Sequence, residues 1–183
     1  MGQNIVLTGF MGTGKTTVGK VIAEELQLSF TDIDEEIKKR YSMNIGDIFE
    51  AYGEKHFRRV ESEVVKELSS VKNHVISTGG GVVLDYNNIA MLQRNGMIFW
   101  LSATADTIFK NLKREGVCIE DRPLLKADNL YERITQLLLI REAYYKKSYN
   151  CNVCIDKLSV KEAAEECIRF YLTAVKEKCR SII

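Results

Sequence analysis

A glycine-rich segment near the start of the chain has the spacing of a phosphate-binding loop. The segment Gly9-Phe10-Met11-Gly12-Thr13-Gly14-Lys15-Thr16 matches the pattern G-x-x-x-x-G-K-S/T and stands between a predicted strand and a predicted helix. Glycines let the backbone curl so that successive N–H groups and the helix N-terminus face a phosphate chain. Lys15 would bring a point charge to the outer phosphates, and the hydroxyl of Thr16 would ligate Mg²⁺. The alternative is a strand-helix turn with an incidental lysine, but the spacing and context favour phosphate binding.

A pair of carboxylates follows the first predicted helix. Asp32-Ile33-Asp34 comes directly after the short run Leu28-Ser29-Phe30-Thr31. In an extended segment, residues two apart point the same way, here towards the carboxyl end of a strand, where parallel sheets bind ligands. One carboxylate would organise Mg²⁺ and its water, and the other would accept a proton from an attacking hydroxyl. The alternative is an ordinary helix N-cap, with Asp34 preceding Glu35-Glu36.

Further segments have residue types that suit a small anionic ligand. Gly79-Gly80-Gly81 follows a predicted strand, so a ligand would approach its backbone closely, unless the run is only a flexible turn. Arg58 and Arg141 lie on predicted helices and would together bind a carboxylate, although each alone is typical of a solvated helix face. Arg122, in an irregular segment, would close over transferring phosphate or be an ordinary loop arginine.

The cysteine and histidine residues do not favour metal or nucleophilic chemistry. Cys151 and Cys154 form a C-x-x-C pattern, but no second pair or nearby histidine completes a zinc set. On a strand, residues three apart face opposite sides, so the two thiols would not share an ion. His56 and His74 show no triad or ligand spacing, so we expect no catalytic role for them.

The predicted elements alternate between strands and helices. Short apolar runs at 5–7, 75–77, 97–101 and 153–155 indicate buried strands, and helical periodicity follows residues 18–26, 57–68, 134–145 and 160–175. This alternation predicts an α/β fold in which helices cover a parallel sheet. The longest non-periodic stretch, residues 113–127, is typical of a functional lid, with a disordered connection as the alternative.

Length and composition set limits on the class of protein. The 183 residues fit one domain spanning residues 1–183, and 45% apolar with 28% charged residues are typical of a globular chain. The formal net charge of +1 gives no global field towards nucleic acid, and no apolar run is long enough to span a membrane. Five cysteines without an evident signal peptide favour the reducing cytoplasm, and we expect a monomer.

The motifs taken together resemble the shikimate kinase family. The resemblance rests on the phosphate loop, on Asp32-Ile33-Asp34 and Gly79-Gly80-Gly81, and on three further segments. These segments are Gly53-Glu54-Lys55-His56-Phe57-Arg58-Arg59-Val60-Glu61, Arg122-Pro123-Leu124-Leu125 and Arg141-Glu142-Ala143-Tyr144-Tyr145. They occur in order over nearly the whole chain, and their combination is far more specific than the phosphate loop alone.

The resemblance implies transfer of the γ-phosphoryl group of ATP to the 3-hydroxyl of shikimate, a step towards chorismate and the aromatic amino acids. It implies a three-layer α/β sandwich of the P-loop kinase type, with about five parallel strands, a substrate-binding region at 33–61 and a lid at 113–125. ATP would bind Gly12, Thr13, Gly14, Lys15, Thr16, Thr17 and Arg122, and shikimate would bind Asp34, Arg58, Gly79, Gly80, Gly81 and Arg141. Lys15, Asp34 and Arg122 would be catalytic, and Thr16 and Asp32 would hold Mg²⁺. Ile33, in the middle of the carboxylate pair, should point away from the site.

Three other functions remain as alternatives. A regulatory GTPase should carry an N/T-K-x-D motif, which the sequence lacks. A related small-molecule kinase, such as one for gluconate, would share the phosphate loop, although Phe57-Arg58 and the triple glycine favour shikimate. A P-loop NTPase or binding module without kinase activity is disfavoured by the intact Lys15, Asp34 and Arg122.

Overall fold

The centre of the fold is a sheet of five parallel strands in the order β2-β3-β1-β4-β5. The computed structural model describes residues 3–114, 123–125 and 127–180. The strands are β1 (Asn4–Thr8), β2 (Ser29–Asp32), β3 (His74–Ser77), β4 (Gly96–Ser102) and β5 (Cys151–Cys154). All four pairings are parallel, with Val6 opposite Ile76 on one side of β1 and opposite Ile98 on the other.

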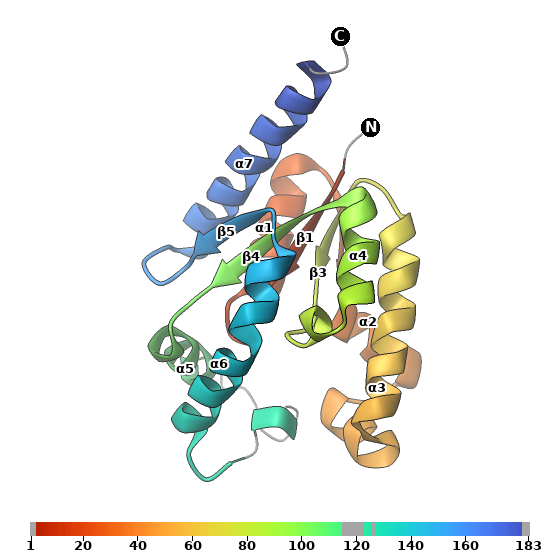
Figure 1. Cartoon of the computed structure of the whole chain (residues 1–183), viewed down its shortest axis with the longest axis vertical. Coiled ribbons are helices and arrows are strands. Elements are labelled where there is room, and N and C mark those ends of the chain that lie inside the picture. Colours follow the sequence, from red (N-terminus) through yellow and green to blue (C-terminus); the bar gives the residue numbers. More distant parts are fainter. Residues whose placement is uncertain (1–2, 115–122, 126, 181–183) are drawn as a thin grey trace.

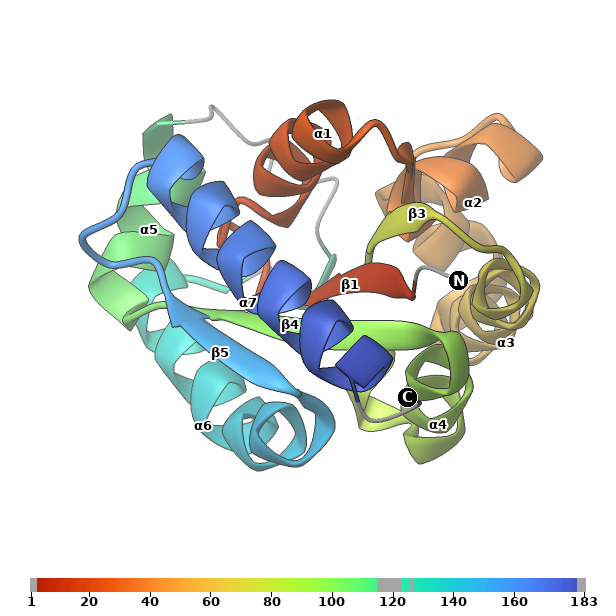
Figure 2. The same cartoon turned by 90° about the horizontal axis from the view of Figure 1, so that it is seen from above.

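Helices cover both faces of this sheet, so the fold has three layers (Figures 1 and 2). Figure 2 shows α1 on one side of the sheet and α4 and α6 on the other. The α-helices are α1 (Lys15–Leu26), α2 (Ile33–Tyr41), α3 (Ile45–Ser70), α4 (Tyr86–Asn95), α5 (Ala105–Arg114), α6 (Leu130–Ser148) and α7 (Val160–Arg180). Among the described residues, η1 (Val82–Leu84) and η3 (Pro123–Leu125) are short 3₁₀ helices. No helix in the described ranges combines the length and apolar character needed to cross a membrane.

The central strand β1 is apolar at successive positions because both of its faces are covered. Ile5 and Leu7 pack in the core beneath α1 and α7, whereas Val6 packs on the opposite face with residues of α3 and α4. All three side chains are fully buried. A strand buried on both faces therefore appears in the sequence as a continuous apolar run rather than an alternating one.

The observed elements confirm the predicted α/β class and extend the predicted segments. The four predicted strands are found, each with bounds shifted or extended by one or two residues, and β2 completes the sheet at one edge. Three helices that the periodicity did not predict, α2, α4 and α5, are only nine or ten residues long. The last helix continues to Arg180, beyond the predicted end at residue 175.

The strand order brings two of the predicted binding segments together. The phosphate loop follows β1, and Gly79–Gly81 follows the adjacent strand β3. The connection after β1 leads to α1 on one face of the sheet, while the connection after β3 leads to α4 on the other. Such a divergence opens a crevice at the carboxyl ends of the strands. In Figure 1 these ends point downwards, between α3 and α6.

The predicted lid is only partly described. Residues 115–122 and 126, including Arg122, lie outside the described residues. Of the remainder, Leu125 in η3 is 1% exposed and packs in a cluster with Phe10 of the phosphate loop and Ile134 of α6. The carboxyl end of the predicted lid is therefore attached beside the phosphate loop.

Candidate active site

A cavity of about 470 Å³ opens at the carboxyl edge of the sheet. It brings together residues predicted from separate segments of the sequence. The predicted site residues that line it are Gly12, Gly14, Lys15, Thr16, Thr17, Asp32, Asp34, Arg58, Gly79, Gly80, Gly81 and Arg141. Thr13 does not line the cavity, because its buried hydroxyl donates to the carbonyl of Phe10 at 2.8 Å within the loop. Its predicted contact with ATP would therefore involve the backbone.

The phosphate loop has the conformation that its glycines allow. Gly12 and Gly14 adopt φ of 80° and 74°, in the left-handed region, and α1 begins directly after them. The ammonium of Lys15 donates to the carbonyl of Phe10 at 2.8 Å, so the lysine side chain folds back onto the backbone of the loop. From α5, the amide of Asn111 donates to the carbonyl of Gly12 at 2.9 Å and fixes the middle of the loop.

Asp32 connects the phosphate loop to the start of α2. Its Oδ2 accepts a hydrogen bond from the hydroxyl of Thr16 at 2.6 Å, and its Oδ1 caps α2 by accepting from the backbone N–H of Asp34 at 3.0 Å. The N-cap alternative is thus realised at Asp32 rather than at Asp34. Ile33 is fully buried in the core, which confirms that it points away from the site.

Asp34 and Glu61 approach the same glycine from two helices. A Cβ atom built on Gly79 would lie 2.8 Å from Oδ1 of Asp34 and 2.9 Å from Oε1 of Glu61. A side chain at Gly79 would therefore displace at least one of these two carboxylates. Oε1 of Glu61 is buried and accepts no hydrogen bond from the described residues. It is therefore an acceptor at the wall of the cavity.

Arg58 lies between two carboxylates of its own helix. Its Nη1 donates to Oε2 of the buried Glu61 at 2.8 Å, and its Nη2 donates to Oε1 of Glu54 at 3.2 Å. Burial raises the pKa of Glu61 to about 7, although the charge of Arg58 opposes this shift. Burial by itself would lower the pKa of Arg58. The charges and hydrogen bonds of Glu61 and Glu54 together outweigh this effect, so the pKa of Arg58 is raised. Arg58 therefore stays charged beside the cavity.

Arg141 enters the cavity from α6 and is 3% exposed. Its Nη1 donates to the carbonyl of Gly80 at 3.3 Å, and the hydroxyl of Tyr145 donates to the same oxygen at 2.7 Å. Its guanidinium carbon lies 5.6 Å from the ring centre of Phe10, as in a cation–π contact. Burial lowers the pKa of Arg141, yet an arginine remains protonated in proteins. The cavity thus holds two guanidinium groups, as the sequence predicted.

Among the residues that line or support the cavity, Glu61, Tyr145 and Asn111 were not among the predicted site residues. Glu61 belongs to the quoted motif around Arg58, but only its burial reveals the acceptor that faces the cavity. Tyr145 follows Arg141 by one helical turn, a spacing that puts both on one face and is the signal that could have found it. Asn111 is 99 residues away from the carbonyl that it binds, so no local pattern predicts it.

The two cysteines of the C-x-x-C pattern differ in burial. Cys151 is buried and Cys154 is exposed, as expected for residues three apart on β5. Within the described ranges, no three His, Cys, Asp or Glu side chains come together as a metal cluster.

Comparison with known proteins decides the family. The sequence model described as "Shikimate kinase" matches residues 11–172 of the chain. The chain belongs to the shikimate kinase family. A shikimate kinase of Caldicellulosiruptor bescii is 47% identical over 172 residues, which are 93% of this chain and 96% of the relative. A shikimate kinase of Caldanaerobacter subterraneus subsp. tengcongensis is 44% identical over 170 residues, with the same coverage of both chains.

A solved structure of a shikimate kinase also has the same fold. The enzyme of Acinetobacter baumannii, described as a complex with shikimate, superposes with a TM-score of 0.88 and 32% sequence identity. The match covers 95% of each chain. The five-stranded parallel sheet with flanking helices is therefore the P-loop kinase fold of shikimate kinases, as the sequence predicted.

Proposed function

We propose that the protein transfers the γ-phosphoryl group of ATP to the 3-hydroxyl of shikimate, in the pathway to chorismate and the aromatic amino acids. Membership of the shikimate kinase family supports this reaction. The observation that carries it is the presence of Arg58, Arg141, Asp34 and the phosphate loop around one cavity. Two guanidinium groups suit the carboxylate of shikimate, and the loop suits a phosphate chain.

Shikimate would occupy the part of the cavity between α2, α3 and α6. Arg58 and Arg141 bind its carboxylate through charge-assisted N–H···O bonds. The ring hydroxyls lie against Asp34 and the backbone of Gly79–Gly81, where the missing side chains permit close approach. Arg58 remains oriented for this contact because Glu54 and Glu61 bind its guanidinium group from the helix side.

Asp34 acts on the attacking hydroxyl. Its carboxylate lies in the first turn of α2 and lines the cavity beside Gly79. There it orients the 3-hydroxyl of shikimate and accepts its proton as the new O–P bond forms, while the γ-phosphate leaves ADP. Positioning of the acceptor supplies much of the rate enhancement in phosphoryl transfer.

ATP would bind with its phosphates in the loop from Gly12 to Thr17. Backbone N–H groups of the loop and the N-terminus of α1 face the phosphates, and Lys15 neutralises the developing charge. Arg122 would close over the phosphates, and this role stays a prediction from the sequence, as does the lid at 113–125.

Mg²⁺ fits the oxygen donors of Thr16 and Asp32. A hydroxyl and a carboxylate 2.6 Å apart form the hard-oxygen donor set that this ion prefers alongside phosphate oxygens and water. When bound, Mg²⁺ supplies positive charge that stabilises the transferring phosphate. Thr16 and Asp32 would hold it directly or through water, and Asp32 remains oriented by its hydrogen bonds to α2.

The setting of the reaction stays a prediction. We propose a monomer that acts in the cytoplasm on small molecules. We also propose that it has no nucleic acid or membrane partners, because its charged residues nearly balance at a net charge of +1. A single domain over residues 1–183 and a substrate-binding region at 33–61 belong to the same proposal.

A panel of acceptors tests the function. ADP release is followed with ATP, Mg²⁺ and, in turn, shikimate, quinate, gluconate, AMP or no acceptor. We expect turnover only with shikimate, and loss of that turnover in Lys15→Ala. Turnover with gluconate would establish the related small-molecule kinase instead. ADP release without any acceptor would indicate an NTPase, and no release at all would indicate a binding module.

A further inference from the structure

A group of aromatic and cationic side chains lies where the end of α2 packs against α3 near Gly53, and we call it the hinge cluster. It consists of Tyr41, Tyr52, His56 and Arg59. The hydroxyl of Tyr41 lies 2.7 Å from Nε2 of His56, and Nη2 of Arg59 lies 3.3 Å from Nδ1 of the same ring. Tyr52 stacks on His56 with ring centres 4.9 Å apart. The imidazole therefore contacts three other side chains at once.

The hydrogen bonds assign the proton on His56. A guanidinium group has only donors, so Nδ1 of His56 must accept from Arg59. The neutral ring then carries its hydrogen on Nε2 and donates it to the hydroxyl oxygen of Tyr41. Nε2 thus connects α3 to the end of α2 through Tyr41, while the bond of Nδ1 to Arg59, within α3, fixes the orientation of the ring.

The cluster spans a break in α3. Gly53 has φ 79° and ψ 163°, so α3 consists of two helical segments on either side of this glycine. Tyr52 ends the first segment, whereas His56 and Arg59 lie in the first turns of the second. A glycine with non-helical dihedrals imposes little conformational restraint on the joint. The contacts of His56 therefore cross the point where α3 is least restrained by its own backbone.

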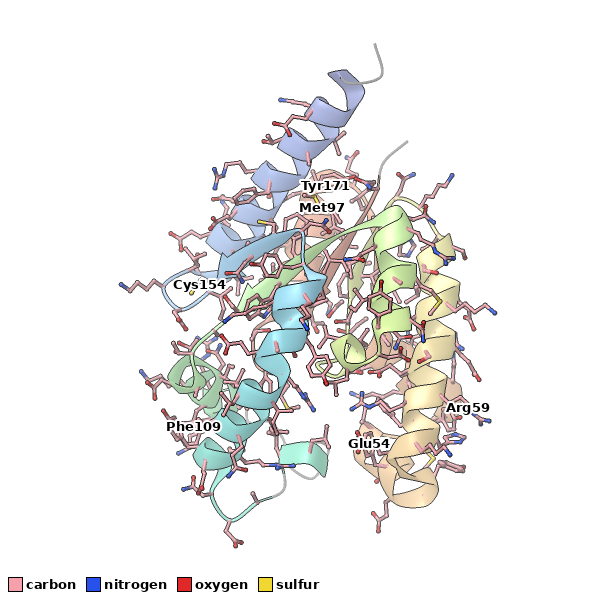
Figure 3. The ribbon with its side chains drawn as sticks, in the orientation of Figure 1. Glu54, Arg59, Met97, Phe109, Cys154 and Tyr171 are labelled. Carbon is pink, nitrogen blue, oxygen red and sulfur yellow. The ribbon has the colours of Figure 1, made fainter. Side chains whose placement is uncertain are left out.

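The opposite side of the second segment carries the substrate residues. His56 and Arg58 are two residues apart, about 200° around a helix axis, so they face opposite directions. Figure 3 shows Arg59 on the side of α3 that points away from α6, whereas Glu54, which binds Arg58, lies on the inner side. The hinge cluster thus contacts the side of α3 that is opposite to the cavity, while Arg58 and Glu61 face the cavity.

We propose that His56 is a positioning residue for substrate binding, which acts by locking the hinge at Gly53 and so fixing Arg58 against the cavity. This inference rests on the proposed function only for its substrate. Without the contacts of His56, the second segment of α3 could move relative to α2. The distance between Arg58 and Asp34 would then no longer be fixed. The phosphate loop lies on another element, so binding of ATP would be unaffected.

Three substitutions separate the contacts of His56. His56→Phe keeps a ring against Tyr52 but removes both hydrogen bonds, and Tyr41→Phe removes one. His56→Gln restores a donor and an acceptor. We expect KM for shikimate to rise about tenfold or more in His56→Phe and about fivefold in Tyr41→Phe, the effect of lost hydrogen bonds, with partial rescue in His56→Gln. KM for ATP should change less than about twofold in all three.

The exposed neighbour Lys55 provides the matched control, because it lies on the same turn outside the cluster. Lys55→Gln should leave both KM values unchanged. Unchanged KM for shikimate in a folded His56→Phe variant, or equal rises in KM for shikimate and ATP, would overturn the proposal. If the wild-type protein does not phosphorylate shikimate, the proposed function fails, and hydrogen exchange then tests the hinge by itself. Amides of residues 45–60 should exchange faster in His56→Phe than in Lys55→Gln. Equal rates would show that the contacts of His56 do not restrain α3 at Gly53.

Discussion

The hydroxyl of Thr16 donates a 2.6 Å hydrogen bond to Oδ2 of Asp32, although the two residues belong to different elements. Thr16 lies in the first turn of α1, and Asp32 ends β2 at the edge of the sheet. The other oxygen of Asp32 caps α2, whose first turn carries Asp34. One carboxylate therefore connects the phosphate loop with the acceptor side of the cavity.

Asp32→Asn should weaken the binding of Mg²⁺ without unfolding α2. Asparagine is as good an N-cap as aspartate, so the cap survives, while the charge that favours the cation is lost. We expect the Mg²⁺ concentration for half-maximal rate to rise at least about tenfold, the effect of about 1.4 kcal/mol. A titration of Mg²⁺ at fixed ATP measures this. Asp32→Ala, which loses the cap as well, should also melt at a lower temperature, and identical melting of the two variants would contradict the capping role.

Asp34→Asn should lower kcat with shikimate by about 10² to 10⁴, the usual contribution of a positioned general base. KM for ATP should stay nearly constant, because Asp34 acts on the acceptor. Steady-state kinetics with each substrate varied in turn measure both values. Glu36→Gln on the same helix, whose carboxylate pairs with Arg40 at the surface, should remain fully active. A wild-type kcat in Asp34→Asn would remove Asp34 from the reaction.

Gly79→Ala tests the close approach of the two carboxylates. The added methyl group would lie within 3 Å of oxygens of both Asp34 and Glu61, so at least one carboxylate must move. We expect kcat to fall at least about tenfold, since a small displacement of a reacting group is costly. A wild-type kcat in a folded Gly79→Ala variant would contradict this positioning of the two carboxylates.

Because of Glu61, the free energy of unfolding should fall as the pH rises. Its pKa is raised from 4.5 to about 7 in the folded state because the carboxyl group is buried. The folded protein therefore binds more protons than the unfolded chain between these values, and the contribution of Glu61 is lost as pH rises through about 7. At about 1.4 kcal/mol per pH unit, the loss is about 3 kcal/mol.

Urea unfolding of the wild-type protein and Glu61→Gln at pH 5 and pH 8 measures this contribution. The wild-type protein should lose more free energy of unfolding between these pH values than the variant, which cannot titrate at this position. Equal losses in both proteins would show that the pKa of Glu61 is not raised.

The sequence predicted the parts of the site that depend on local pattern. The loop from Gly12 to Thr16 needs particular residues at fixed spacing, and a parallel sheet brings the ends of β1 and β3 to one edge. From the residues alone, the convergence of Arg58 and Arg141 was one of two alternatives, and the resemblance to a family favoured it, because the convergence depends on the packing of α3 and α6.

The rest depends on contacts between distant residues. Glu61 looks like any helix-surface glutamate until its burial beneath Gly79 is known. No role of His56 was predicted from the sequence, because its partner Tyr41 is 15 residues away on another helix. Helices α2, α4 and α5 were not predicted because they are only nine or ten residues long, so each contributes few apolar positions at helical spacing. Caps such as Asp32 and Asp85 fix where two of them begin.

The structure of the product shows directly whether the 3-hydroxyl of shikimate is the phosphoryl acceptor. Wild-type protein is incubated with ATP, Mg²⁺ and shikimate, and the product is examined by ¹H–³¹P correlation NMR. We expect one phosphate ester, with its phosphorus coupled to the proton on carbon 3 of the ring, and no such product in Asp34→Asn. A phosphate on another hydroxyl, or release of ADP and inorganic phosphate without an ester, would contradict it.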